Sequence, residues 1–380
     1  MQKCLNCGCT EEKYFGLRNS KIYCRRCIVF KGENARIKNS KRKMIIKPNL
    51  KYSLTIKQKE LSKRTCEAIK NKKDVLIYAV CGAGKTEIVY DAIADVLNSD
   101  GQVGFCIPRK DVVIELEDRI KNAFPLVKVV AVYGGHTKEL EGDIILLTTH
   151  QLYRYNNYFD LLIIDETDAF PFSNNEMLIR MFEKSLKGNY IMMSATPLKW
   201  MEDKIKKDKG VSLSLYKRFH GHKIVEPKLK IVPLFQEIDI FFLLKRFKKE
   251  NKPCLIFVPT KYEAESLFLK MKTVFSNIEY VHSSRKNREE IISKFKKNEF
   301  LFLITTSILE RGITIKNLQV IVYKAEHKIY NAETLIQISG RVGRKVDAYD
   351  GDVIFLAKKP TEFIVEAIEK IKEANKYGMV

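Results

Sequence analysis

The sequence predicts an α/β protein in which two parallel-sheet lobes follow a small cysteine-rich module. The chain has 380 residues, 45% of them hydrophobic, which suffices for two full α/β domains and one extra module. Short apolar runs of strand type alternate with segments of helical spacing, as is typical of parallel sheets. Five of the nine cysteines fall within the first 27 residues, which indicates a separate module at the front.

The composition of the chain divides it into five expected segments. The segment 38–51 is basic, contains Pro48 and lacks periodicity, so we interpret it as a linker. A second basic stretch, without long apolar periodicity, marks the crossing between the lobes. The expected segments are a four-cysteine module over 1–37, a basic linker over 38–51, a first lobe over 52–200, a basic interdomain segment over 201–227 and a second lobe over 228–380.

The front module carries two Cys-x2-Cys pairs, Cys4 with Cys7 and Cys24 with Cys27, separated by sixteen residues. This spacing is typical of a structural zinc site, in which four thiolates fill all four positions around one ion. Cys9 is a second candidate for the place of Cys7, and the spacing favours Cys7. In a cytosolic protein a metal is favoured over disulfides.

Aromatic and basic side chains lie between and just after the cysteine pairs, which suits contacts with nucleic-acid bases and phosphates. The alternative is that the aromatic rings are the apolar filling of a small module. The residues concerned are Tyr14, Phe15, Arg18, Lys21, Tyr23, Arg25 and Arg26.

The charge of the chain is strongly basic and uneven. Residues 1–50 hold 13 Lys and Arg against 3 Asp and Glu, so +10 of the formal +22 lies there. This favours a polyanionic partner, because cations facing phosphates gain affinity by counterion release. A solvated lysine-rich surface is the alternative. No run approaches the roughly 20 apolar residues of a membrane span and the chain opens without an apolar signal core, so we expect a cytoplasmic protein.

Residues 79–87 read Ala-Val-Cys-Gly-Ala-Gly-Lys-Thr-Glu and fit the pattern of a phosphate-binding loop. A strand-type run over 74–79 precedes the loop and a segment of helical spacing over 87–97 follows it, which is the required context. The glycines permit a tight turn whose N–H groups meet phosphate oxygens. We expect Lys85 to hold the β- and γ-phosphates of ATP and Thr86 to bind Mg²⁺; the expected nucleotide contacts are Ala79, Gly82, Ala83, Gly84, Lys85 and Thr86.

A second acidic element follows the apolar run 159–164 and reads Asp165-Glu166-Thr167-Asp168. In open α/β sheets ligands bind outside the carboxyl ends of strands, where these residues are expected. We expect Asp165 to bind the Mg²⁺ and Glu166 to orient and deprotonate the attacking water. Adjacent carboxylates alone also suit a helix cap, but together with the phosphate-binding loop they favour catalysis.

Asp165-Glu-x-Asp168 behind such a loop resembles motif II of the superfamily-two helicases, and further motifs of that superfamily follow in order. The resemblance implies two RecA-like lobes, adenine reading by Gln58, and backbone contacts with nucleic acid from two strand-end loops. It also implies that Arg341 and Arg344 act as arginine fingers on the γ-phosphate, with Gln337 in the same nucleotide site. We expect the two arginines to share one face of a helix. The matching segments are Gln58, 107–110, 148–151, 194–196, 310–314 and 337–344.

The four-cysteine front, the segment 165–172 (Asp-Glu-Thr-Asp-Ala-Phe-Pro-Phe) and the segment 218–222 (Arg-Phe-His-Gly-His) together resemble the late competence ATPase family ComFA, over essentially the whole chain. Thr167 departs from the family, in which an apolar or small residue is more usual at this non-catalytic position. The resemblance implies DNA-stimulated ATP hydrolysis that draws single-stranded transforming DNA into the cytoplasm. It implies the partners ComEC, a membrane channel, and ComFC, with recruitment to the inner face of the membrane, and an oligomer is compatible with it.

Two rival functions remain at this point. An RNA helicase or replication-restart helicase with a zinc accessory would separate duplexes and respond equally to RNA. A passive nucleic-acid-binding scaffold with a vestigial ATP site would not turn ATP over. The rate of ATP hydrolysis with and without single-stranded DNA separates these functions.

Overall fold

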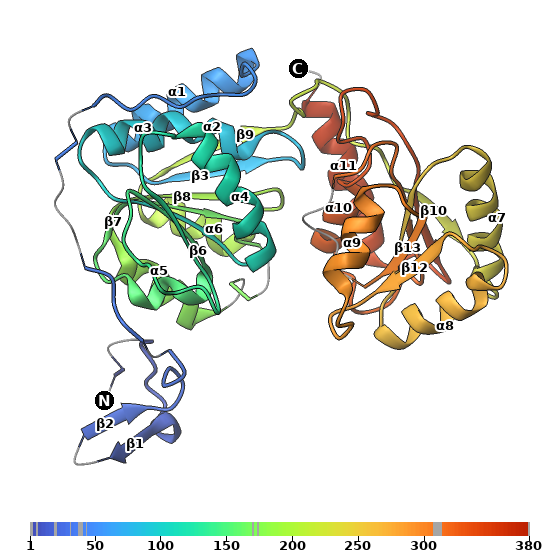
Figure 1. Ribbon diagram of the computed structural model, residues 1–380, viewed down its shortest axis with the longest axis horizontal. Helices are drawn as coiled ribbons and strands as arrows, with labels where there is room; N and C mark the ends of the chain where they lie inside the picture. The colour runs from blue at the N-terminus through green and yellow to red at the C-terminus, as the bar shows by residue number, and fades with distance from the viewer. Residues whose placement is uncertain are drawn as a thin grey trace. The chain divides into compact units, whose positions relative to one another are not determined.

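The computed structural model of the chain (Figure 1) divides into two compact units. The first comprises Met1–Ala79 and Gly84–Leu215, and the second comprises Val80–Ala83 and Tyr216–Val380. Among the helices of the described chain, none has the length and apolar character that a membrane crossing requires. The described residues are 3–4, 7–18, 21–30, 32–36, 41–42, 44–168, 171–172, 175–306 and 314–378.

The first unit begins with a small antiparallel hairpin, formed by β1 (Phe15–Arg18) and β2 (Lys21–Cys24) after the short 3-10 helix η1 (Glu12–Tyr14). Phe15 pairs with Cys24 in this hairpin, so the end of β2 delivers the second pair of cysteines. The expected linker over 38–51 has no helix or strand among its described residues. It is nevertheless attached to the first unit, since the Arg42 guanidinium lies 2.7 Å from the Asp143 carboxylate.

A seven-stranded parallel sheet forms the body of the first unit, with strand order β5-β6-β4-β7-β8-β3-β9. All adjacent strands run parallel, so the strands are joined by crossover connections. The strands are β3 (Val75–Ala79), β4 (Val103–Ile107), β5 (Val129–Val132), β6 (Ile144–Thr148), β7 (Phe159–Asp165), β8 (Leu186–Ser194) and β9 (Val211–Leu215). The helices are α1 (Ile56–Lys70), α2 (Lys85–Ile88), α3 (Tyr90–Asn98), α4 (Lys110–Ala123), α5 (Glu176–Ser185) and α6 (Lys199–Lys207), with the 3-10 helix η2 (Thr149–Arg154).

The first unit extends further along the chain than the segment 52–200. Residues 201–215 contain most of α6 and all of β9, and β9 pairs with β3 along its whole length. The β9 sequence alternates exposed serines with buried Leu213 and Leu215, the pattern of an edge strand with one covered face. Two buried leucines are too few to produce a long apolar periodicity. For this reason the sequence predicts a basic interdomain segment here and no strand.

The second unit is built on a six-stranded parallel sheet with strand order β10-β15-β14-β11-β13-β12. The prediction of two parallel-sheet lobes is therefore confirmed. The strands are β10 (Lys228–Ile231), β11 (Cys254–Phe257), β12 (Ile278–Val281), β13 (Phe302–Thr305), β14 (Gln319–Val322) and β15 (Val353–Ala357). The helices are α7 (Gln236–Lys249), α8 (Lys261–Lys272), α9 (Arg288–Lys296), α10 (Ala332–Ser339) and α11 (Glu362–Tyr377).

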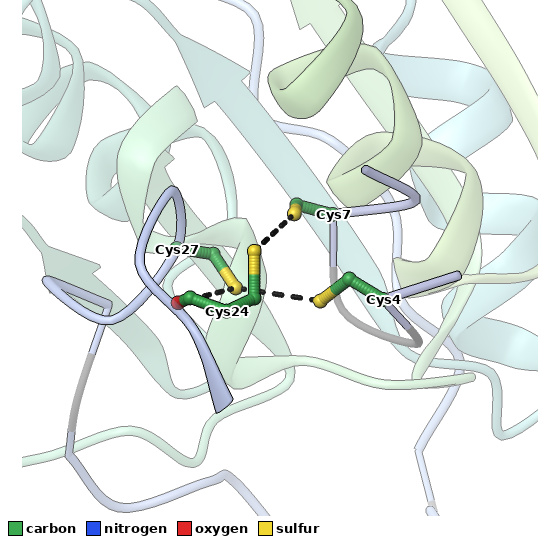
Figure 2. Close-up of side chains that lie close together, drawn as sticks. All are labelled: Cys4, Cys7, Cys24 and Cys27. Atoms are coloured by element: carbon green, nitrogen blue, oxygen red, sulfur yellow. Dashed lines mark hydrogen bonds between the residues drawn. The ribbon is translucent and has the colours of Figure 1, made fainter. Parts of the chain in front are cut away.

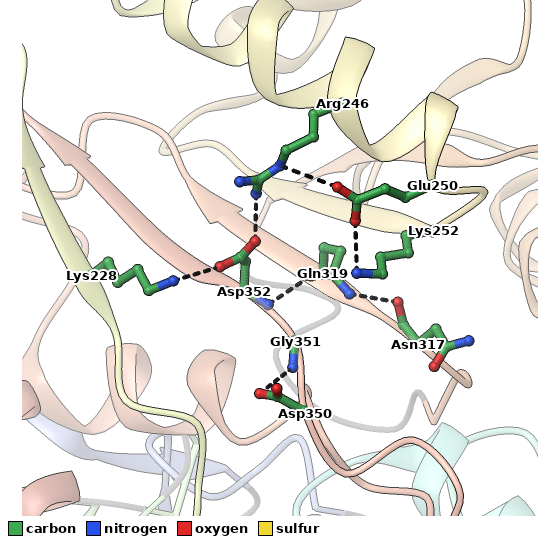
Figure 3. A network of polar contacts seen from close by, with 9 residues as sticks. All are labelled: Lys228, Arg246, Glu250, Lys252, Asn317, Gln319, Asp350, Gly351 and Asp352. Atoms are coloured by element: carbon green, nitrogen blue, oxygen red, sulfur yellow. Dashed lines mark hydrogen bonds and ion pairs between the residues drawn. The ribbon is translucent and has the colours of Figure 1, made fainter.

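Polar contacts around Asp352 fix the start of β15 (Figure 3). The carboxylate of Asp352 pairs with Lys228 of β10 at 2.9 Å and with Arg246 of α7. Its backbone N–H donates to the Gln319 side chain of β14 at 2.6 Å. One residue therefore holds an edge strand, a central strand and a covering helix together, and these contacts position the segment between α10 and β15.

Two expectations about helices are corrected by the structure. The helical spacing over 87–97 belongs to two helices, α2 and α3, which meet at Val89. Arg341 and Arg344 do not share a helix face, because α10 ends at Ser339. The chain then turns through Gly343, whose φ of +69° a helix cannot contain.

Candidate ATPase site and cysteine cluster

The phosphate-binding loop lies between the end of β3 and the start of α2. Gly82 and Gly84 have φ of +81° and +75°, in the left-handed region that favours glycine. A Cβ on Gly84 would also lie 2.5 Å from the amide nitrogen of Gln58, so the Gln58 side chain would have to shift to admit one. Helix α2 begins at Lys85 directly after the loop, and the side chains of Lys85 and Thr86 are half-buried. Ala79 and Ala83 are buried beneath the turn.

Gln58 lies beside the phosphate-binding loop and also caps α1. Its backbone N–H donates to the Thr55 hydroxyl at 3.3 Å, and its side-chain oxygen accepts from the Thr55 N–H at 2.9 Å. This reciprocal capping box fixes the first turn of α1. Gln58 therefore lies at the loop, and its amide oxygen takes part in the helix cap. Thr-x-x-Gln is a sequence signature of the capping box, but the sequence analysis did not assign this role.

The acidic element follows β7 directly. Asp165 is the last residue of β7, and burial raises the pKa of its carboxyl group while the nearby Lys85 ammonium lowers it. The Asp165 carboxylate accepts the backbone N–H of Glu166 at 2.8 Å. Glu166 has a φ of +56°, a strained conformation for a residue with a Cβ. Such strain is concentrated at functional sites, where the surrounding structure imposes it.

Asp168 joins the acidic element to the end of β8. Its two carboxylate oxygens accept the hydroxyls of Ser194 at 2.8 Å and Thr196 at 3.1 Å. The Ser194 oxygen also accepts the Thr196 N–H at 2.9 Å. Thr167 is fully buried and donates its hydroxyl to the Met193 carbonyl at 3.3 Å, so this unusual residue is satisfied within the fold. Sequence reasoning quoted Asp168 as part of the motif without a role; its contact with the 194–196 segment gives it one.

All these residues lie at one edge of the first sheet, because the strands that carry them run parallel. The loop after β3, the acidic element after β7 and the segment 194–196 after β8 follow three adjacent strands. The segments 107–110 and 148–151 follow β4 and β6, on the other side of β7. The order of strands thus separates the ATP motifs from the two loops expected to contact nucleic acid, along a single sheet edge.

In the second unit, Gln337 is buried in α10, and Arg341 is buried in the turn that follows this helix. Arg344 is half-buried, and its Nε donates to the Gly340 carbonyl at 2.8 Å. The arginines are thus held by the end of α10 and the turn behind it. Of the segment 310–314, only Thr314 lies within the described residues, as do only the first four and the last two residues of 165–172.

The cysteine pairs of the front module converge on one point (Figure 2). The sulfurs of Cys4, Cys7, Cys24 and Cys27 all lie within 4.8 Å of one another. The distances are 3.6 Å from Cys4 to Cys27 and 3.6 Å from Cys7 to Cys24. Four sulfurs placed tetrahedrally 2.3 Å from one Zn²⁺ lie about 3.8 Å apart, so the cluster is compatible with zinc.

Cys9 lies outside the cluster. Its sulfur faces the Glu11 carbonyl at 4.0 Å, while the backbone carbonyl of Cys9 accepts the N–H of Cys4 at 2.9 Å. Gly8, with a φ of +67°, turns the chain away after Cys7. Geometry thus places Cys7 with the other three cysteines.

The segment after the cysteine cluster packs against η2 of the first unit. The ring of Phe30 stacks on His150 with centroids 6.1 Å apart and also contacts Tyr153 at 5.5 Å. The buried Arg154 donates to the Glu33 carbonyl at 2.7 Å, and its own carbonyl accepts the Ala35 N–H at 3.0 Å. The module is therefore attached to the segment 148–151, a connection that no local sequence signal announces.

Two family models match the chain. Residues 51–199 match the model described as "Type III restriction enzyme, res subunit", and residues 232–346 match the "Helicase conserved C-terminal domain". These ranges cover the phosphate-binding loop with the acidic element, and the segment that carries both arginines. The chain is accordingly an ATPase of the superfamily-two helicase type.

Relatives and solved structures point the same way. The structure of Dbp5 from S. cerevisiae bound to RNA and ADP BeF3 is similar with a TM-score of 0.65 and 18% identity, covering 82% of this chain and 87% of that one. The structure of RecG bound to a three-way DNA junction is similar with a TM-score of 0.61 and 20% identity, covering 87% of this chain and 47% of that one. These likenesses show the two-lobed helicase fold.

Over almost its full length the chain is similar to two competence proteins. It is 34% identical to the competence protein ComFA of Bacillus subtilis (strain 168), covering 98% of this chain and 85% of the relative. It is 32% identical to ComFA of Streptococcus pneumoniae, covering 98% of this chain and 90% of the relative. With the helicase motifs on parallel strand ends and the four cysteines gathered at the front, the chain belongs to the ComFA family of superfamily-two helicases.

Proposed function

We propose that the protein is an ATP-driven motor that moves single-stranded DNA during DNA uptake in natural competence. The observation that supports this most is the order of motifs along one sheet edge. Two ATP motifs follow β3 and β7, the segment 194–196, which resembles the motif coupling hydrolysis to movement, follows β8, and two strand-end loops follow β4 and β6. An ATP site and a nucleic-acid track on one rigid sheet suit a motor in which hydrolysis changes the grip on the strand. The competence setting rests on the family of the chain.

The first unit supplies the hydrolytic residues in this proposal. Lys85 and the loop N–H groups hold the phosphates, and Thr86 and Asp165 hold the Mg²⁺ that accompanies ATP. This ion, when bound, neutralises charge on the β- and γ-phosphates. A carboxylate and a hydroxyl suit a hard divalent cation, whose charge would offset the desolvation that raises the pKa of Asp165. Glu166 takes the proton of the water that attacks the γ-phosphorus, while ADP departs.

The remaining assigned residues bind the nucleotide or stabilise the developing charge. We assign adenine recognition to Gln58 and backbone contacts to Ala79, Gly82, Ala83 and Gly84. Arg341 and Arg344 stabilise the charge on the γ-phosphate, and Gln337 contributes to nucleotide binding. Arginine suits this task because its guanidinium stays charged and offers a planar fork of donors to phosphate oxygens.

We propose further that Cys4, Cys7, Cys24 and Cys27 hold one structural Zn²⁺. Burial raises the pKa of the Cys7 thiol to about 11, so four thiolates at this point need a divalent cation to compensate them. The hairpin is too small to bury a core of its own, and a metal supplies folding free energy to such modules. The basic and aromatic side chains of the module then face single-stranded DNA.

The partners of the motor are proposals that rest on the family resemblance alone. ComEC, the membrane channel, would deliver the strand, and ComFC would bind beside the motor on the cytoplasmic side. Recruitment to the inner face of the membrane would then occur through ComEC.

The test is the steady-state rate of ATP hydrolysis with single-stranded DNA, duplex DNA and RNA in parallel, at one stated salt concentration. Single-stranded DNA should stimulate the wild type most, and Lys85→Ala should abolish turnover while it retains DNA binding. Equal stimulation by RNA with duplex unwinding would favour an RNA or restart helicase. Robust hydrolysis by Lys85→Ala would overturn the assignment of the site.

A further inference from the structure

A buried arginine in the second unit grips the turn that carries Arg341 and Arg344. Arg218 is 2% exposed, one of the largest fully buried side chains of the described residues. Its Nη1 donates to the carbonyls of Val342 at 2.7 Å and Gly343 at 2.6 Å, and its Nη2 donates to the Gly340 carbonyl at 3.3 Å. One guanidinium thus bonds three of the four carbonyls between Gly340 and Gly343.

These carbonyls include the end of α10, where backbone oxygens have no partner within the helix and carry partial negative charge. The Gly340 carbonyl also accepts from Arg344 Nε at 2.8 Å, so Arg218 and Arg344 share an acceptor. The turn leaves no slack, because a Cβ on Gly343 would lie 2.3 Å from the Tyr349 carbonyl oxygen and 3.0 Å from Arg218 Nη1. The guanidinium and the turn therefore determine each other's position.

Two histidines that follow Arg218 complete the grip. His220 Nε2 lies 3.0 Å from the Gly343 carbonyl, and because a carbonyl only accepts, Nε2 carries the proton. The other ring nitrogen of His220 accepts the His222 N–H at 3.2 Å. The His222 ring in turn stacks flat on Tyr349, with centroids 3.6 Å apart.

The arrangement is costly for the fold, which argues against a role in stability alone. Among the described residues Arg218 forms no ion pair with a carboxylate, and its Nε has no hydrogen-bond partner. Burial and the neighbouring Arg344 lower the pKa of Arg218 to about 10. Buried cations without a carboxylate partner are rare because desolvation opposes them, and they are concentrated where function requires them.

We propose that Arg218, with His220 and His222, is a positioning clamp that holds the 340–344 turn so that Arg341 and Arg344 keep the orientation needed for ATP hydrolysis. In this proposal the clamp affects hydrolysis through the two arginines, whose turn it holds. The proposal rests on the proposed ATPase function of these arginines. It explains why a segment outside the common helicase motifs carries a buried arginine and two histidines.

The test compares kcat and KM for ATP at saturating single-stranded DNA in Arg218→Lys, with Lys217→Gln as the control that removes a neighbouring exposed charge. Lysine keeps the charge and loses the fork of donors. A misplacement of about 1 Å costs up to about 100-fold in rate, so kcat should fall about 10- to 100-fold with KM changed less than about 3-fold. When Arg344→Gln is already present, adding Arg218→Lys should lower kcat by less than about a further 3-fold.

The histidine variants keep the test decisive if Arg218→Lys does not fold. His220→Gln retains an N–H donor for the Gly343 carbonyl and should keep at least about half of the wild-type kcat, whereas His220→Leu should lower kcat about 10-fold or more. The clamp would be overturned by an unchanged kcat in Arg218→Lys or by equal kcat values in the two His220 variants. It would also be overturned if the kcat losses of Arg218→Lys and Arg344→Gln multiplied in the double variant. A wild type without hydrolysis would instead overturn the proposed function.

Discussion

The contact between Asp168 and the end of β8 yields a quantitative prediction. Asp168→Ala removes the acceptor of two hydroxyls, those of Ser194, which is fully buried, and Thr196, which is 7% exposed. A buried hydroxyl left without its partner costs about 1–3 kcal/mol. Part of this is recovered because the Ser194 oxygen still accepts the Thr196 N–H. We therefore expect a loss of about 3 kcal/mol in the free energy of unfolding of the first unit.

The assay is scanning calorimetry of the full chain, with Asp203→Ala as the control because Asp203 is an exposed acidic residue of α6. A unit of this size shifts by about 2–4 °C for each kcal/mol, so the first unit should melt about 6–12 °C lower in Asp168→Ala and within about 1 °C of wild type in the control. The double variant with Ser194→Ala should lose less than the sum of the single variants, because both break the same contact. Additive losses, or a shift below about 2 °C for Asp168→Ala, would contradict the stabilising role of this contact.

Three further predictions follow from the site. Purified protein should contain one zinc per chain. Cys4→Ser should lower the zinc content and weaken DNA binding more than basal hydrolysis, whereas Cys9→Ser should retain the metal. Active protein without zinc would contradict the proposed metal site. Gly84→Ala should lower ATP affinity at least about 10-fold in nucleotide titrations, because its φ is +75° and the added methyl meets Gln58; unchanged affinity would contradict the loop geometry. Burial lowers the pKa of His150, so the unfolded chain binds the proton more readily than the folded chain. The free energy of unfolding should therefore fall as the pH drops below about 6.5. His150→Phe should weaken this loss in unfolding titrations, and a pH profile identical to that of the wild type would contradict the prediction.

The sequence sufficed where function depends on local backbone chemistry. The turn at Gly82 and Gly84 needs positive φ, which only glycine adopts without strain, so the loop can be recognised from its glycines. Asp165 could be placed at a strand end because an apolar run precedes it, and β7 does end there. Parallel strands then bring such ends to one edge without further information.

Contacts between residues far apart in the chain could not be predicted in this way. Arg218 meets Val342 across 124 positions, and no periodicity or spacing links them. The docking of Phe30 on His150 is equally long-range. Helix α10 ends at Ser339 and the chain turns at Gly343. The three-residue spacing of the arginines, taken alone, indicates a continuous helix. Tertiary contacts decide such positions, whereas local propensity sets only a weak preference.

The most direct test of the motor is translocation itself. The measurement is ATP-dependent displacement of streptavidin from the biotinylated end of a single-stranded DNA oligonucleotide, with the biotin placed at either end in separate reactions. The wild type should displace streptavidin from one end, and Lys85→Ala should displace none, although both proteins bind the strand. Rapid ATP hydrolysis by the wild type without displacement from either end would contradict the claim that the protein moves along single-stranded DNA.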